Sequence, residues 1–313
     1  MLWRTVRRFL IFLASLVVAS IAVFWLLSGL GDPARIALGT SGTDQGVAAL
    51  RAQMGLNRPL TSQYLSWAGD ALHGSFGSSY LNKSEIGPQL FDRLSVTFWL
   101  VGGAMVLSLI IALPLGLLTA LWHRRAVGWI LSALTQLGVA VPAFLVGILA
   151  VALFAVKLGW LPSGDYVVPA SDPVGFVQHM ILPWCSLGLV QGAVLTRYVR
   201  SAILDEMGQD YLRTARSKGL TPFQALLRHG LRNASIPVLT VLGVQLVTIL
   251  VGAVVVEQVF VIPGIGSWLV ESVGNQDILQ VQAIVMTLVA IALVVSFVID
   301  ILYSLIDPRL RQR

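Results

Sequence analysis

The residues whose types and spacing could support chemistry are few, and they form no catalytic constellation. The four histidines, His73, His123, His179 and His229, are scattered along the chain without an H-E-x-x-H pair or the spacing of a metal-ligand cluster. Cys185 is the single cysteine, so an intrachain disulfide is excluded. The chain has no G-x-S-x-G nucleophile turn, and no lysine follows a glycine, as a Walker A loop requires. We therefore expect no enzymatic activity, and no cofactor or metal bound by this chain itself.

The composition points to a membrane protein. Of the 313 residues, 56% are hydrophobic and 12% are charged, and the mean hydropathy is +0.82. Soluble domains usually carry about 25% charged residues, so there are too few charges here to cover a water-exposed surface. This argues against a soluble enzyme, a disordered regulator and a secreted disulfide scaffold.

Six apolar stretches reach or approach the roughly 20 residues that a helix needs to cross the hydrocarbon core. They lie within residues 8–32, 93–123, 125–157, 179–197, 232–257 and 277–300. The fourth is short, and we expect its helix to continue past Arg197 and Arg200, whose long stems can reach the headgroups. A cleaved signal peptide is the weaker interpretation of the first stretch, which is longer than the ~7–15 residues of a signal core. The sequence thus predicts an all-α integral membrane protein with six transmembrane helices.

The distribution of charge predicts the orientation of these spans. With a cytoplasmic N-terminus, most of the 21 lysines and arginines fall on the inner side, and most acids fall outside. An even number of spans puts both termini in the cytoplasm, so the net charge of +6 reflects orientation, and nucleic acid is not an expected partner. The predicted organisation is a cytoplasmic tail and first span (1–31), an extracytoplasmic loop (32–93), a transmembrane core (94–306) with an inner loop at 200–233, and a cytoplasmic tail (307–313).

The outer loop is far longer than usual connections. We expect Asp44 to cap a helix that ends at Gly55, and Pro59 to open another helix through Trp67. A loop of this length either faces a partner or is unstructured, and the sequence leaves both interpretations open.

The inner loop has the clearest local pattern. Residues 210–218 are typical of a short helix, and Gly219 follows where left-handed geometry is needed. Thr221, Pro222 and Gln224 form a capping box that opens a second helix. We expect the apolar side of that helix to carry Phe223, Leu226, Leu227 and Leu231. This predicts a helix–turn–helix elbow on the inner membrane face, and spans on both sides argue against a DNA-binding role.

The elbow also carries a family resemblance. Asp-Tyr-Leu-Arg-Thr-Ala-Arg-Ser-Lys-Gly-Leu at 210–220, Arg-His at 228–229 and Arg-Asn-Ala at 232–234 resemble the cytoplasmic EAA loop of ABC importer permeases. Arg-Thr-Ala at 213–215 replaces the general Glu-Ala-Ala, which is the form typical of the peptide/nickel permease family, on the DppB/OppB side.

Further segments resemble the same family along essentially the whole chain. They are Phe-Gly-Ser-Ser at 76–79, Val-Pro-Ala-Phe at 141–144, Leu-Gly-Trp-Leu-Pro at 158–162, Glu-Gln-Val-Phe at 257–260, Pro-Gly-Ile-Gly at 263–266, and the ending from Tyr303 to Asp307-Pro308-Arg309.

The resemblance implies a type I importer transmembrane domain with a cytoplasmic coupling helix. The function it implies is half of a translocation pathway for di- or oligopeptides, with a nickel chelate or a glutathione-like solute as the alternative substrate. The partners it implies are a second permease of the DppC/OppC kind, two ATP-binding subunits that use ATP and Mg, and an extracytoplasmic substrate-binding protein or lipoprotein. Membrane lipid would surround the assembly.

Three sets of candidate residues follow from these patterns. The ATPase contact is assigned to Asp210, Tyr211, Arg213, Thr214, Ala215, Arg216, Gly219 and Leu220. The outer gate and binding-protein contact is assigned to Glu257, Phe260, Pro263, Gly264, Gly266 and Trp268. The pathway and its hinges are assigned to Pro114, Gln136, Pro142, Phe144, Gln191 and Gln245.

Each set has a plainer interpretation. The elbow helix could rest on anionic headgroups as an amphipathic segment. The gate segment, in which we expect Ser267 to cap a short helix after a break at 263–266, could be an interfacial Trp anchor. Pro114 and Pro142, expected to interrupt the second and third spans, could serve packing alone, and the glutamines could join helices.

A stand-alone secondary transporter or channel is the alternative function. Inverted repeats with interrupted helices and ionisable groups inside the membrane would support it. Neither is clear in the sequence, and spans without a central charge favour a passage for bulky solutes.

Overall fold

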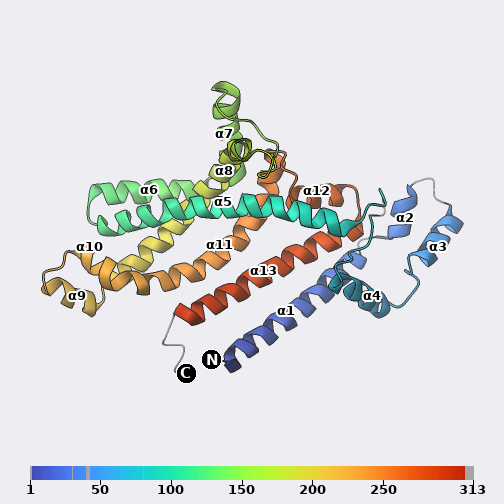
Figure 1. Ribbon diagram of the computed structural model, residues 1–313, viewed down its shortest axis with the longest axis horizontal. Coiled ribbons are helices and arrows are strands. Elements are labelled where there is room, and N and C mark those ends of the chain that lie inside the picture. Colours follow the sequence, from blue (N-terminus) through green and yellow to red (C-terminus); the bar gives the residue numbers. More distant parts are fainter. Residues whose placement is uncertain (1, 30, 40–42, 80, 307–313) are drawn as a thin grey trace. The chain divides into compact units, whose positions relative to one another are not determined.

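The computed structural model describes residues 2–29, 31–39, 43–79 and 81–306, and these residues are predominantly helical (Figure 1). Within these ranges the β pairing consists of one isolated antiparallel bridge, Ser78 with Glu85. The predicted all-α class is confirmed. The expected tail 307–313, with the Asp307-Pro308-Arg309 part of the family-like ending, lies outside the described residues.

Long apolar helices supply the candidate membrane spans. Five pass the test of length and composition, and a bent pair brings the number to six if it forms one span. The single helices are α1 (Leu2–Ser28), α5 (Ile86–Leu121), α8 (Pro173–Met207), α11 (Leu231–Val259) and α13 (Ile278–Ile306). The pair is α6 (Ala126–Ala140) with α7 (Ala143–Ala150), which continues as a π-helical segment, Val151–Lys157.

The two prolines expected to interrupt spans behave differently. Between α6 and α7 the axis bends by 95°, because Pro142 has no N–H and forces Val141 into an extended conformation with ψ 125°. Pro114, in contrast, lies inside α5 without ending it, so the prediction of an interrupted second span was wrong. The fourth span does continue past Arg200, as expected, in a helix of 35 residues.

The chain divides into two compact units, residues 1–96 with 264–297, and residues 97–263 with 298–313. In the first unit, α1 packs on α4 (Leu60–Leu72) through a cluster of rings. Phe24 and Tyr64 lie 5.5 Å apart between ring centroids, Trp67 stacks beside both, and the hydroxyls of Ser20 and Tyr64 are 2.8 Å apart.

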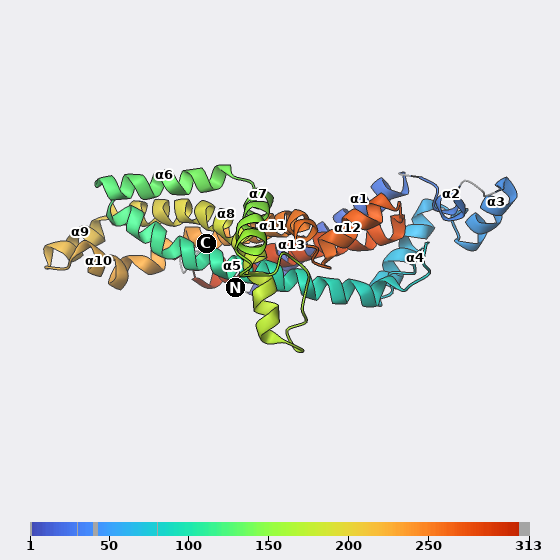
Figure 2. The ribbon, with the colours of Figure 1, turned by 90° about the horizontal axis from the view of Figure 1, so that it is seen from above.

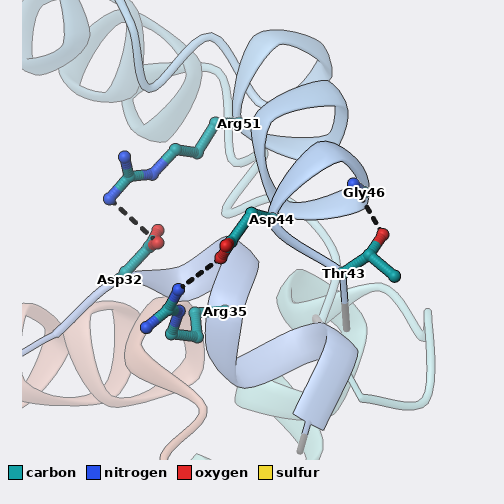
Figure 3. Close-up of polar contacts among 6 residues, drawn as sticks. All are labelled: Asp32, Arg35, Thr43, Asp44, Gly46 and Arg51. Atoms are coloured by element: carbon teal, nitrogen blue, oxygen red, sulfur yellow. Dashed lines mark hydrogen bonds and ion pairs between the residues drawn. The ribbon is translucent and has the colours of Figure 1, made fainter. Parts of the chain in front are cut away.

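The segment expected to be a long loop is folded into helices. Asp32 caps α2 (Pro33–Leu38), and the ion pairs Asp32–Arg51 at 2.9 Å and Arg35–Asp44 at 3.0 Å join α2 to α3 (Asp44–Gln53), as Figure 3 shows. Thr43 is the cap of α3, and its Oγ1 accepts a hydrogen bond from the Gly46 N–H. The prediction that Asp44 would be the cap was wrong, because Asp44 is the first residue of the helix. Pro59 does precede α4, as predicted.

The core of the first unit forms around α12 (Ile265–Gly274). Ile86 and Leu90 of α5, Ile265 and Trp268 of α12, and Ala283 and Ile284 of α13 are all buried in one cluster. This cluster seats α12, which carries part of the predicted gate.

In the second unit α8 is central and contacts α6, α7 and α11. Glycines let α5 and α8 approach closely. A Cβ on Gly188 would lie 2.9 Å from Leu107, and one on Gly192 would lie 3.1 Å from Ile111. Small residues at helix crossings are typical of packing inside membranes. In this unit, α8 and α11 lead into and out of the elbow.

Candidate functional site

The elbow consists of α9 (Asp210–Ser217), α10 (Pro222–Ala225) and the π-helical segment Leu226–Gly230, which runs into α11. Figures 1 and 2 both show α9 and α10 side by side beyond the ends of α8 and α11. The predicted elbow is thus present in the fold.

Local backbone chemistry determines the elbow, as expected. Gly219 has φ +93°, in the left-handed region, directly after the cap of α9. Thr221 Oγ1 accepts from the Gln224 N–H at 3.2 Å, and Gln224 Oε1 accepts from the Thr221 N–H at 3.1 Å. Both the glycine stop and the capping box are confirmed.

The elbow is seated by small and aliphatic side chains. Leu212 and Ala215 of α9, with Ala225 and Leu226, are buried against Val199, Ala202 and Ile203 of α8. We call this cluster the seat. It holds α9 against the end of α8, because detaching α9 would expose the buried apolar area of these side chains to water.

The expected apolar side of the second helix was only partly right. Leu226 is fully buried, but Phe223, Leu227 and Leu231 are exposed. Phe223, Leu227 and Leu231 are spaced four residues apart and share one exposed face, whereas Leu226 and Gly230 share the buried face.

Three polar side chains tie three helices together at the base of the elbow, and we call them the clamp: Glu206 of α8, Tyr211 of α9 and Asn233 of α11. The Tyr211 hydroxyl donates to Glu206 Oε1. Asn233 Nδ2 donates to Glu206 Oε1 at 3.2 Å and lies 3.1 Å from the Tyr211 hydroxyl oxygen. Sequence reasoning selected Tyr211 and missed Glu206, since nothing in a single sequence signals a partner on the preceding helix.

The candidate contact residues of the elbow are mostly exposed. Asp210, Tyr211, Arg213, Thr214, Arg216 and Gly219 are exposed, Leu220 is half-buried and Ala215 is buried. Arg213 and Asp210 form a surface ion pair at 3.7 Å, which contributes little to stability. The exposed residues form a polar surface, whereas Ala215 belongs to the seat beneath it.

Glu257 lies inside the protein. A candidate of the predicted outer gate, it is fully buried in α11, and Thr97 Oγ1 donates a hydrogen bond to its Oε1 at 2.6 Å. The helix continues for two residues beyond Glu257, which keeps the carboxylate within the packed end of α11.

Phe260 is also fully buried, beneath the segment after α7. A Cβ on Gly147 would lie 2.9 Å from its ring, and its carbonyl oxygen accepts from the Asp165 N–H at 2.8 Å. In the same segment, burial raises the pKa of the Tyr166 phenol. Pro263, which follows, is exposed.

The remaining gate candidates belong to the first unit. Gly264 precedes α12 as its cap, and Ser267 Oγ donates a hydrogen bond back to the Gly264 carbonyl at 2.9 Å. Ser267 therefore lies inside the helix, and the prediction that it would be the cap was wrong. Gly266 and Trp268 are buried, and the Arg93 guanidinium lies 5.2 Å from the centroid of the Trp268 ring. A ring packed within the protein argues against an interfacial Trp anchor.

The pathway candidates are not gathered into one site. Gln191 and Gln245 are buried, and within the described part of the chain their Oε1 atoms have no hydrogen-bond partner. Pro114, Pro142 and Phe144 are exposed. Gln136, also exposed, lines a cavity of about 30 Å³ with residues of α8, which is room for a water molecule.

Across the described ranges, no group of three or more His, Cys, Asp or Glu side chains is arranged to hold a metal ion.

Comparison with known proteins covers nearly the whole chain. A family model described as binding-protein-dependent transport system inner membrane component matches residues 112–312, and its N-terminal companion matches residues 1–101. The glutathione transport system permease protein GsiC of Escherichia coli strain K12 is 35% identical over 314 residues and covers 100% of both chains. The protein of the same name from Salmonella typhi is also 35% identical with the same coverage. A crystal structure of an amino acid ABC transporter with histidines aligns with a TM-score of 0.49 and 19% identity, over 71% of this chain and 94% of that one.

Proposed function

Because this chain belongs to the family of binding-protein-dependent inner membrane components and is an ABC importer permease of the peptide/nickel type, we propose that it forms half of a translocation pathway for small peptides. Glutathione-like tripeptides are the favoured class, since full-length relatives at 35% identity are named as glutathione transport permeases. Longer peptides and nickel chelates are the alternatives. Family membership argues against a stand-alone secondary transporter or channel.

The elbow is the proposed contact with an ATP-binding subunit. The observation that carries this proposal is the clamp, because it joins α9 to the ends of both α8 and α11. A force applied to α9 therefore reaches two membrane helices directly instead of bending a flexible loop. Ala215 holds α9 in its seat, and the other candidate residues make the contact: the exposed Asp210, Tyr211, Arg213, Thr214, Arg216 and Gly219 and the half-buried Leu220.

The partners follow from the family. A second, related permease completes the pathway, two ATP-binding subunits bind ATP and Mg, and an extracytoplasmic binding protein delivers the solute. The chain itself is a non-catalytic subunit. The elbow faces the cytoplasm together with both termini, as the distribution of basic residues predicts.

The segment from Glu257 to Trp268 is the proposed outer gate. In this conformation Glu257, Phe260 and Trp268 are buried, so the gate acts through rearrangement of packed side chains. Gln258, Val261 and Pro263 are exposed for a docked binding protein. Gln191 and Gln245 are the proposed pathway glutamines, because their buried carbonyl oxygens have no partner within the described residues.

Uptake into proteoliposomes tests this function. The assembled transporter, with ATP enclosed and binding protein outside, should accumulate radiolabelled glutathione or a dipeptide only when MgATP is present. Accumulation driven by an ion gradient through this chain alone would overturn the proposal. Uptake of a nickel chelate without peptide uptake would retain the importer and reject the peptide substrate.

A further inference from the structure

A pocket in the first unit has polar groups that its own residues do not satisfy. Its volume is about 190 Å³, and its walls come from the end of α1, the segment 54–67 and the start of α13. The lining residues that matter here are Ser28, Arg58, Trp67, Ile278 and Gln282.

Two of these residues have unpaired donors. Trp67 Nε1 and Gln282 Nε2 are buried, and neither has a hydrogen-bond partner among the described residues. Gln282 is only 6% exposed. Because an unpaired buried donor is costly, an acceptor entering the pocket would be stabilised. The terminal amide torsion of glutamine is soft, so a small rotation can direct its N–H groups onto that acceptor.

Arg58 supplies a cation at the same pocket. Its side chain folds over Gly55, where a Cβ would lie 3.6 Å from Arg58 Nε. Its backbone is held by Gln63, whose Nε2 donates to the Arg58 carbonyl at 2.8 Å and to the Leu56 carbonyl at 3.0 Å. Within the described ranges the Arg58 guanidinium is in no ion pair. The pocket therefore offers a positive charge and N–H donors without a compensating carboxylate.

The pocket lies where two candidate spans end. Ser28 is the last residue of the span Val6–Ser28, and Ile278 is the first residue of the span Ile278–Leu302. The ends of spans lie at the level of the headgroups, where tryptophan and arginine are common. Next to the pocket, Trp25 and Leu26 of α1 are 69% and 68% exposed, which is an apolar surface suited to acyl chains.

We propose that this pocket binds the phosphate group of a membrane phospholipid. Phosphate oxygens accept hydrogen bonds and carry the negative charge that Arg58 complements. A volume below the ~300 Å³ of typical ligand pockets suits a headgroup whose chains remain outside. The inference requires that the chain spans the membrane, and it does not depend on the proposed peptide substrate or the elbow contact.

Native mass spectrometry of the purified transporter tests the site. The probes are dioleoylphosphatidylglycerol, dioleoylglycerol, which has the same chains without a phosphate, and inorganic phosphate. We expect phosphatidylglycerol to bind, dioleoylglycerol not to bind at this site, and inorganic phosphate to compete only weakly because it lacks the chains.

Variants assign the binding to the pocket. Arg58→Ala should weaken phosphatidylglycerol binding roughly tenfold, as expected for the loss of one charge-assisted hydrogen bond. Trp67→Phe keeps the ring and removes the donor, and should weaken binding by a smaller factor. Arg35→Ala is the matched control, since Arg35 is an exposed arginine of the same segment whose partner is Asp44.

Three results would overturn the proposal. Unchanged lipid binding in both Arg58→Ala and Trp67→Phe would remove the pocket from the site. Equal binding of dioleoylglycerol would show that no phosphate is recognised. Occupancy by inorganic phosphate or by a dipeptide in preference to the lipid would make this a site for a soluble anion.

Discussion

Ser79 Oγ donates a hydrogen bond of 2.5 Å to Asp277 Oδ2, and both side chains are buried. Asp277 also accepts from the Gln280 N–H through Oδ1, at the start of α13. The pair joins the Phe-Gly-Ser-Ser segment to the α12–α13 connection, 198 residues away along the chain. Within the first unit, the buried Asp277 carboxylate thus links these two segments, and it accepts hydrogen bonds from the Ser79 hydroxyl and the Gln280 N–H.

Ser79→Ala should destabilise the first unit. The substitution leaves Asp277 Oδ2 without its hydroxyl donor, and leaving a buried acceptor unpaired costs about 1–3 kcal/mol of unfolding free energy. Ser75→Ala, at an exposed serine of the same segment, is the control and should have no effect. Thermal unfolding of the purified chain, followed by tryptophan fluorescence, measures both. Equal midpoints for the two variants would mean that the pair does not stabilise the unit.

Gly219→Ala should loosen α9 through the backbone alone. A Cβ on Gly219 meets nothing within 4 Å, but φ is +93°, and an L-residue in the left-handed region costs about 1–2 kcal/mol. Amides of α9 should then exchange with deuterium roughly 5–30 times faster. Gly208→Ala is the control, because Gly208 has φ −76° and an ordinary helical conformation. Identical exchange in both variants would refute the strain argument.

Tyr211→Phe and Asn233→Ala should reduce the coupling between ATP hydrolysis and transport. Tyr211→Phe takes α9 out of the clamp and Asn233→Ala takes α11 out of it, so α9 transmits less of its movement to α8 and α11. We expect the ratio of solute imported to ATP hydrolysed to fall several-fold, with normal membrane insertion. The double variant should be little worse than either single one, because the two residues act together. Ser217→Ala on the same helix, whose hydroxyl bonds only its own helix, is the control. A normal ratio in both single variants would reject the clamp as the link.

Local patterns in the sequence predicted the elbow well, because its determinants are neighbours along the chain. The glycine stop at Gly219 and the capping box at Thr221 act over three or four residues. The positions of the candidate spans were predicted for the same reason, since apolar length is a local property, but α8 begins at Pro173 and ends at Met207, beyond both limits of its apolar stretch.

What the sequence did not predict depends on distant partners or on helix register. The Ser79–Asp277 pair and the clamp join residues that no periodicity relates. In the second helix of the elbow, Leu226 packs in the seat while Leu227 and Leu231 are exposed, which depends on the neighbouring helix and not on apolar spacing alone. The burial of Glu257 and Trp268 follows from packing with α5 residues, Thr97 in one case and Ile86 in the other, which a single sequence does not pair with them.

Two adjacent glycines of α5 should respond differently to the same substitution. A Cβ on Gly103 would overlap the indole of Trp184 in α8, whereas one on Gly102 meets nothing within 4 Å. The indole cannot easily move away, because Trp184 Nε1 donates to the Trp99 carbonyl at 3.0 Å.

Gly103→Ala should therefore lower the unfolding free energy of the second unit by about 1–3 kcal/mol, the usual cost of overpacking. Gly102→Ala should be neutral or slightly stabilising, since alanine is favoured over glycine within a helix. Thermal unfolding of the two variants under the same conditions compares them directly, with the Gly102 variant as the matched control. If both variants unfold at the wild-type temperature, α5 and α8 can separate at this crossing without loss, and the close glycine contact is not what holds them together.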